Sequence, residues 1–246
     1  MQSTELAAKL AEADSQELAA LVEEHLSELD LPAVRQIVRN PYVTSEVLSA
    51  LVGNRRLLGI YEVRRELARH PQIPQIHAMR LMPTLFWRDL MELGLDPRVL
   101  PVVRRAADRQ LVNRLGSLAV GERMAVARRA SHGVLVHLRF DSHSQVIGAF
   151  LENPRMTQGL LLPLVASESA APEILRLISE NRRWGVLYPV RQGLVRNPRT
   201  PPVIAMALLS RLKKLDRQAV ARDRRLSPAL RQKARRSLGE TSRDRP

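Results

Sequence analysis

An internal repeat is the feature that most constrains how this chain can fold. Residues 67–82 read LARHPQIPQIHAMRLM, and residues 194–209 read LVRNPRTPPVIAMALL. These segments lie 127 positions apart. At this offset, residues 46–111 (the first copy) align without a gap to residues 173–238 (the second copy). The two copies are identical at 24 of 66 positions. Self-similarity over this length is typical of folds that stack one structural unit. Residues that the copies share are therefore expected to serve the architecture.

Short helices separated by proline corners are predicted for the repeat region. The segments LPAVRQIVR, YEVRRELAR and FWRDLMELGL each end at an X-Pro pair, namely Asn40-Pro41, His70-Pro71 and Asp96-Pro97. Proline disfavours helix in the residue before it, and a Ser, Thr or Pro about three residues later suits the start of the next helix. These prolines and those at 154 and 198 indicate units of roughly 22 to 30 residues, the size of a stacked helix pair. Side-chain hydrogen bonds to neighbouring turns are predicted for Asn40, Asn153 and Asn197.

The first 30 residues differ from the rest of the chain in charge. They hold eight acids and one lysine, with leucines at helical spacing, which predicts one or two amphipathic helices. Asp14 or Ser15 suits the N-cap of the second. We interpret residues 1–30 as acidic capping helices; the alternative is a strip that neutralises or autoinhibits the basic C-terminal end. Residues 31–238 are interpreted as the helical-repeat region, and residues 239–246 as a flexible tail.

Two segments carry a family resemblance. VRNPYVTSEVLSAL at 38–51 and LVRNPRTPPVIAMALL at 194–209 resemble the leucine-rich-repeat-variant family, whose units combine an Asn-Pro, a Thr-Pro or similar start and a Leu-rich helix. More broadly, the chain resembles HEAT and armadillo-like repeats. The resemblance implies an all-α fold, a curved right-handed α-solenoid of short helices. Some members of the variant family hold an iron–sulfur cluster on cysteine ligands, which does not carry over because this chain has no cysteine.

The composition excludes several classes of site. Without cysteine there are no disulfides, thiolate metal sites or cysteine nucleophile. The six histidines form no HExxH pair, and no GxGxxG, P-loop, GxSxG or paired-carboxylate motif is present. We therefore predict no cofactor, no metal site and no catalytic residue. No apolar run approaches the roughly 18 to 20 residues that span a bilayer, and the acidic N-terminus does not resemble a signal peptide, so a soluble, cytoplasmic protein is expected.

Positive charge is concentrated in the second copy. The formal net charge of the chain is +14, and residues 182–246 hold 18 Lys and Arg against four acids. Equivalent positions of stacked units line one surface, so these cations are predicted to bind an anionic partner. Positions that are basic in the second copy alone, such as Arg199 and Lys213, are the stronger candidates. The predicted binding residues are Arg182, Arg183, Arg196, Arg199, Lys213, Lys214, Arg217, Arg224 and Arg225.

Three functions fit this pattern. The first is a non-catalytic interaction scaffold that binds an acidic protein segment or another anionic partner through its basic C-terminal half. The second is nucleic-acid binding through the phosphate backbone, with little base readout because aromatic residues make up only 3% of the chain. The third follows from a resemblance to HEAT-like DNA glycosylases of alkylated bases, in which Trp87, Asp89 and Trp184 would act; the recurrence of Asp89 as Asp216 favours a structural role instead. The partner and the oligomeric state stay open.

Overall fold

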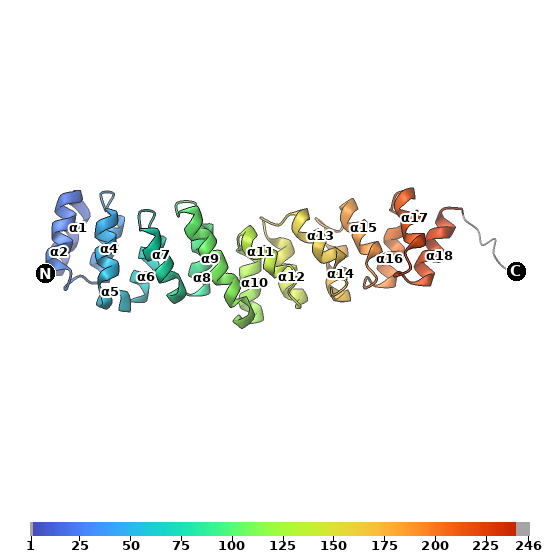
Figure 1. Ribbon diagram of the computed structural model, residues 1–246, viewed down its shortest axis with the longest axis horizontal. Coiled ribbons are helices and arrows are strands. Elements are labelled where there is room, and N and C mark those ends of the chain that lie inside the picture. The colour runs from blue at the N-terminus through green and yellow to red at the C-terminus, as the bar shows by residue number, and fades with distance from the viewer. Residues whose placement is uncertain (1, 240–246) are drawn as a thin grey trace. The chain divides into compact units, whose positions relative to one another are not determined.

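A computed structural model describes residues 2–239, and the described part of the chain is helical throughout, without a strand (Figure 1). The predicted all-α class is therefore confirmed. The chain separates into two compact units, Met1–Ser117 (unit 1) and Leu118–Pro246 (unit 2). The boundary between the units falls inside the predicted repeat region 31–238. Apart from Gly239, the predicted tail 239–246 lies outside the described residues.

Unit 1 is built from short helices that pack on neighbours in chain order. Within it α3 packs between α1 and α6, and α6 also contacts α8. The helices are α1 (Gln2–Glu12), α2 (Ser15–His25), α3 (Leu31–Arg39), α4 (Ser45–Gly53), α5 (Arg55–Gly59), α6 (Tyr61–Arg69), α7 (Gln75–Leu81), the 3-10 turn η1 (Met82–Thr84), α8 (Trp87–Leu95), α9 (Pro101–Arg114) and the 3-10 turn η2 (Leu115–Ser117).

Unit 2 follows the same plan. In it α12 packs between α10 and α14, and α15 contacts α13, α16 and α17. Its helices are α10 (Val120–Arg129), α11 (His132–Leu138), α12 (Ser144–Glu152), α13 (Gln158–Ala166), α14 (Pro172–Glu180), α15 (Tyr188–Arg196), α16 (Pro202–Leu209), α17 (Lys214–Arg222) and α18 (Pro228–Ser237).

Several helices have bounds that agree residue for residue between the two copies at the repeat offset. Helices α4, α6 and α8 of unit 1 begin and end 127 positions before α14, α15 and α17 of unit 2. The agreement extends beyond the aligned segments, because α3 begins and ends 127 positions before α13. The copies differ elsewhere: residues 55–59 form α5, whereas residues 182–186 form turns. In addition, α16 ends one position later than the equivalent of α7, and α18 ends earlier than the equivalent of α9.

Capping residues and prolines set these bounds as expected. Asp14 caps α2 with a full capping box, in which its carboxylate accepts from Gln16 and Glu17 and Glu17 reaches back to the Asp14 N–H. Thr44 and Thr157 accept from the third backbone N–H of α4 and α13. The apolar faces fixed by these starts form the core, in which Leu48, Leu51 and many other Leu, Val and Ala side chains are fully buried.

Three buried asparagines each join a corner to the end of the helix that lies two helices earlier in the chain. Asn40 Oδ1 accepts from the Tyr42 N–H at 2.7 Å, and its Nδ2 donates to the carbonyls of Leu10 at 3.0 Å and Ala13 at 2.9 Å. These bonds close one corner and satisfy carbonyls at the end of another helix, which otherwise lack partners. Asn153 does the same with the carbonyls of Ala127 and Ala130, and Asn197 with those of Val165 and Ser167. The predicted role of these asparagines in neighbouring turns is confirmed.

Other residues at the same position retain part of this pattern. His70 Nδ1 accepts from the Gln72 N–H at 3.2 Å, and the ring also bonds the backbone of Val38. Burial of the ring lowers the pKa of His70, because the interior disfavours its charged form. Asp96 accepts from the N–H two residues later and lacks a donor for the preceding helix. The corner is thus made by several side chains that share one acceptor geometry.

Within the described range no helix combines the length and apolar character needed to cross a membrane.

Candidate anion-binding surface

The nine predicted binding residues divide between two opposite ends of the helices in unit 2. The corner group lies at or just after the ends of α15 and α17 and is Arg196, Arg199, Arg224 and Arg225. The entry group lies in the turns between α14 and α15 and in the first turns of α17, and is Arg182, Arg183, Lys213, Lys214 and Arg217. The Lys213 N–H donates to the Tyr188 hydroxyl at 3.0 Å, which brings together the starts of α15 and α17. A nine-residue helix is about 13 Å long, and roughly this distance separates the two groups.

Two exposed cations of the entry group, Lys213 and Lys214, lie at the start of α17. Lys213 is the N-cap of this helix and Lys214 is its first residue, and the N-cap makes no side-chain hydrogen bond to the helix. The Lys213 ammonium lies 5.1 Å from the centre of the Tyr188 ring. Cations at a helix start face the positive end of the helix dipole, so an anion bound there would relieve unfavourable electrostatics. This end of α17 is therefore suited to a negatively charged partner.

Arg217 differs from the rest of the entry group because it is half-buried. Its Nη1 donates to the Ser237 carbonyl at 3.1 Å, and its buried Nε has no hydrogen-bond partner among the described residues. The guanidinium therefore joins α17 to the end of α18. We assign it a structural role rather than a share in binding.

Within the corner group, Arg225 is already occupied. Its guanidinium bonds the Asp223 carboxylate at 2.8 Å and the Glu168 carboxylate at 2.9 Å, in the corner that follows α13. The hydrogen bonds from Arg225 hold the pKa of Asp223 below its usual value. The side chains of Arg199 and Arg224 are exposed and make no ion pair within the described part of the chain. They remain available to a partner, whereas Arg225 does not.

A tyrosine–aspartate pair recurs in both copies. Tyr61 donates to Asp89 and accepts from the Phe86 N–H at 2.9 Å, and the same arrangement links Tyr188, Asp216 and Lys213. Burial raises the pKa of both tyrosines, and the neighbouring aspartate raises each further. Since both copies keep the pair, it belongs to the architecture, as the recurrence of the aspartate predicted.

The supply of acids distinguishes the copies. Residues 55–111 hold 11 cations and six acids, whereas the equivalent residues 182–238 hold 16 cations and two acids. Both acids of the second segment are engaged: Asp216 accepts from Tyr188 and from Gln192, and Asp223 pairs with Arg225. Among the described residues, the cations that only the second copy has, such as Arg199, Lys213 and Arg224, form no ion pair with either acid.

A hollow between α13 and α15 lies beside Arg196. It has a volume of about 320 Å³, and its lining is Leu162, Ala166, Glu168, Pro189, Gln192, Gly193, Arg196, Asn197, Pro198 and Arg225. Arg196 and Arg225 are among the binding residues predicted from the sequence, whereas Leu162 and Gly193 were not predicted. A signal existed, because the repeat offset places these two residues at the positions of Arg35 and Glu66 in unit 1.

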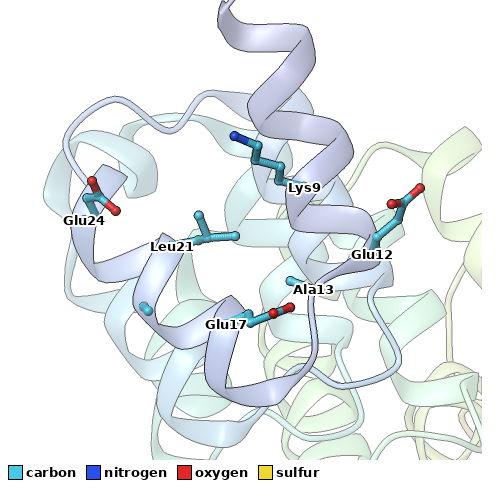
Figure 2. A pocket seen from close by; sticks show the side chains of 7 residues that line it. Lys9, Glu12, Ala13, Glu17, Leu21 and Glu24 are labelled. Atoms are coloured by element: carbon cyan, nitrogen blue, oxygen red, sulfur yellow. The ribbon is translucent and has the colours of Figure 1, made fainter.

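A second hollow lies between α1 and α2 in unit 1. Figure 2 shows Lys9 and Glu12 extending from α1, with Glu17, Leu21 and Glu24 on α2. Its volume is about 590 Å³. Three glutamates against one lysine give it a negative balance, opposite to that of the second copy. No group of three or more potential metal ligands occurs among the described residues.

Trp184 is a core residue. It is 4% exposed, and its Nε1 donates to the Leu151 carbonyl at 2.9 Å. A ring in this position is not free to stack on an extruded base. Asp89, the acid considered with it, is held by Tyr61 in unit 1.

Comparison with known proteins gives no relative: no family model, no curated protein and no solved structure matches this chain.

Proposed function

We propose that this chain is a non-catalytic helical-repeat protein of the cytoplasm, whose second copy binds an acidic segment of a partner protein. Its helix pairs would stack as in HEAT and leucine-rich-repeat-variant solenoids. The observation that carries the proposal is the charge asymmetry between the copies: the second copy has 16 cations but two acids over residues 182–238, and both acids are occupied. Exposed like charges repel one another, and an acidic partner would offset this repulsion.

Exposed aliphatic residues beside the cations favour a protein partner over a nucleic acid. Leu215 follows Lys213 and Lys214 directly and is 78% exposed, and the first copy has Arg88 at the equivalent position. Val203, at the start of α16, is 81% exposed. Binding to phosphates needs no apolar side chain, whereas protein interfaces combine apolar contacts with charge complementarity. The burial of Trp184 also removes an aromatic surface for base stacking.

Binding of an acidic peptide tests this function. The probe is a fluorescein-labelled peptide of nine residues, with one serine between two runs of four glutamates (the serine peptide), and the readout is fluorescence anisotropy at about 50 mM salt. The double variant Lys213→Glu with Lys214→Glu is expected to weaken binding by more than about tenfold, since each reversal replaces attraction by repulsion. The binding should also weaken as salt rises.

A matched control is the double variant Arg80→Glu with Arg105→Glu, which changes the same amount of charge on exposed residues of unit 1. It is expected to change the affinity by less than about threefold, because these positions lie outside the proposed surface of the second copy. Equal losses in both double variants would contradict a binding surface in the second copy. Tight binding of random duplex DNA at the same salt, without binding of the peptide, would establish the nucleic-acid alternative instead.

A further inference from the structure

The hollow beside Arg196 owes its charge to the loss of an ion pair that the first copy keeps. In the first copy, Arg69 Nη1 lies 2.6 Å from Glu92 Oε2. At the repeat offset Arg69 becomes Arg196, but Glu92 becomes Ala219. No hydrogen bond or ion pair is formed by the Arg196 guanidinium within the described residues, and Asp223 acts on it only at longer range. An arginine whose counterpart binds a carboxylate is thus left without one.

The space in the hollow has a parallel origin. In unit 1 the position is spanned by a second ion pair, with Arg35 Nε 2.9 Å from Glu66 Oε1. The equivalent residues of unit 2 are Leu162 and Gly193, which carry no charge and line the hollow. Val165 packs against Gly193, where a side chain at this position would begin. Leu162, Ala166 and Pro189 give it apolar walls. The same change that removes two charges therefore creates an apolar surface next to a free guanidinium.

We propose that this hollow anchors the acidic partner segment: Arg196 binds a carboxylate of the segment, and the apolar walls receive an aliphatic side chain beside that carboxylate. This inference rests on the proposed function and adds a sequence preference to it. The volume of about 320 Å³ lies at the lower end of the range for ligand pockets and accommodates one aliphatic side chain with part of its backbone. A guanidinium binds a carboxylate through two parallel N–H donors.

Neighbouring groups favour a carboxylate over a phosphate. Glu168 lies in the lining, and its negative charge opposes a doubly charged anion more than a singly charged one. Arg225, the other cation of the lining, is engaged by Asp223 and Glu168. Gln192 donates to Asp216 at 2.6 Å, and both ends of the Asn197 amide are bonded. One free guanidinium is therefore the main polar group that the hollow offers.

A pair of peptides tests the apolar part of the proposal. The leucine peptide replaces the central serine of the serine peptide by leucine and changes nothing else. Burial of a leucine side chain in the hollow is expected to tighten binding by about tenfold or more. Equal affinity for the two peptides, with salt-sensitive binding of both, would overturn the anchor and leave the proposed function standing. Failure of both peptides to bind at about 50 mM salt would overturn the proposed function together with the anchor.

The charge part is tested by restoring the missing acid. Ala219→Glu places a carboxylate where Glu92 stands in the first copy, so it should pair with Arg196 and weaken the leucine peptide by about tenfold. Ala229→Glu is the control, because it adds the same charge at an exposed position of α18 outside the hollow; it should cost less than about threefold. Arg196→Gln should reproduce the effect of Ala219→Glu. Equal losses in Ala219→Glu and Ala229→Glu would overturn the role of Arg196.

Discussion

In the first copy Tyr61 donates to Asp89 and accepts from the N–H of residue 86, and in the second copy Tyr188 donates to Asp216 and accepts from the N–H of residue 213. The residue that supplies this N–H is Phe86 in one copy and Lys213 in the other. The Phe86 ring packs on Tyr61 with centroids 4.4 Å apart, whereas the Lys213 ammonium lies over the Tyr188 ring. The same hydrogen bond, from a backbone N–H to the tyrosine hydroxyl, thus occurs beside an aromatic side chain in the first copy and beside a cation in the second.

The ion pairs show the same division between conserved frame and altered surface. Asp96–Arg98 in the first copy has its counterpart in Asp223–Arg225, within a corner that both copies need. Arg69–Glu92, by contrast, has no counterpart because Ala219 replaces the acid. The corner acid and the acid bonded to tyrosine thus persist in both copies, whereas half-buried acids such as Glu66 and Glu92 are lost in the second. The second copy therefore keeps the fold and changes its electrostatics.

The largest effect is expected where the shared frame is broken. Asn197→Ala removes a buried amide and leaves the carbonyls of Val165 and Ser167 without their donor, which should cost about 3 kcal/mol of unfolding free energy. Urea denaturation followed by circular dichroism measures this loss. Arg199→Ala, which removes an exposed side chain two residues away, should cost less than about 0.5 kcal/mol. A loss below about 1 kcal/mol for Asn197→Ala would show that the corner does not depend on this amide.

The tyrosine pair should contribute equally in both copies. Tyr61→Phe and Tyr188→Phe each remove one hydrogen bond to a carboxylate and one acceptor for a backbone N–H, and about 1 to 2 kcal/mol is expected for either. Both tyrosines have a raised pKa, so their stabilisation is fully present below the pKa of an unfolded tyrosine and is lost as pH rises through the folded value. Urea denaturation at neutral pH and at about pH 11 tests this sign, near the usual tyrosine range. A large effect in one variant alone would contradict the equivalence of the copies.

The smallest expected effect is a difference in pH dependence between the two corners. His70 stands where the second copy has Asn197, and its pKa is lowered by burial. Its stabilisation is present above the pKa of an unfolded histidine and is lost as pH falls through the folded value. His70→Asn should therefore reduce the loss of thermal stability between about pH 8 and pH 5, across the usual histidine range. An unchanged pH dependence of the melting temperature would assign the acid sensitivity to other groups.

Much of the fold could be predicted from the sequence because proline and capping residues act locally. The ends of α3, α6 and α8 follow from Pro41, Pro71 and Pro97, and the start of α4 follows from Thr44 and Ser45. The aligned copies also predicted a structural role for Asp89, which its bond to Tyr61 supports.

The state of individual cations could not be predicted, because it depends on residues distant in the chain. Arg225 is occupied by Glu168, 57 positions away, and Arg217 bonds the Ser237 carbonyl from another helix. The hollow beside Arg196 was missed for a different reason. The hollow forms where charged residues of unit 1 are replaced in unit 2: Arg35, Glu66 and Glu92 correspond to Leu162, Gly193 and Ala219. A search for residues that the copies share does not detect positions at which they differ.

One pair of variants tests most directly whether the second copy carries the anion-binding surface. Four exposed cations of the second copy, Arg199, Lys213, Lys214 and Arg224, are changed together to Gln in the full chain. The matched variant changes four exposed arginines of unit 1, Arg55, Arg80, Arg105 and Arg109, to Gln, so that both variants lose the same charge. Anisotropy with the serine peptide at about 50 mM salt gives the affinity of each.

We expect the second-copy variant to lose more than about tenfold in affinity, because it removes cations that would contact the carboxylates of the peptide. The unit 1 variant should lose less than about threefold, since its four arginines lie outside the proposed binding surface. Equal losses in the two variants would contradict the claim, because the affinity would then follow the net charge of the chain rather than the surface of the second copy.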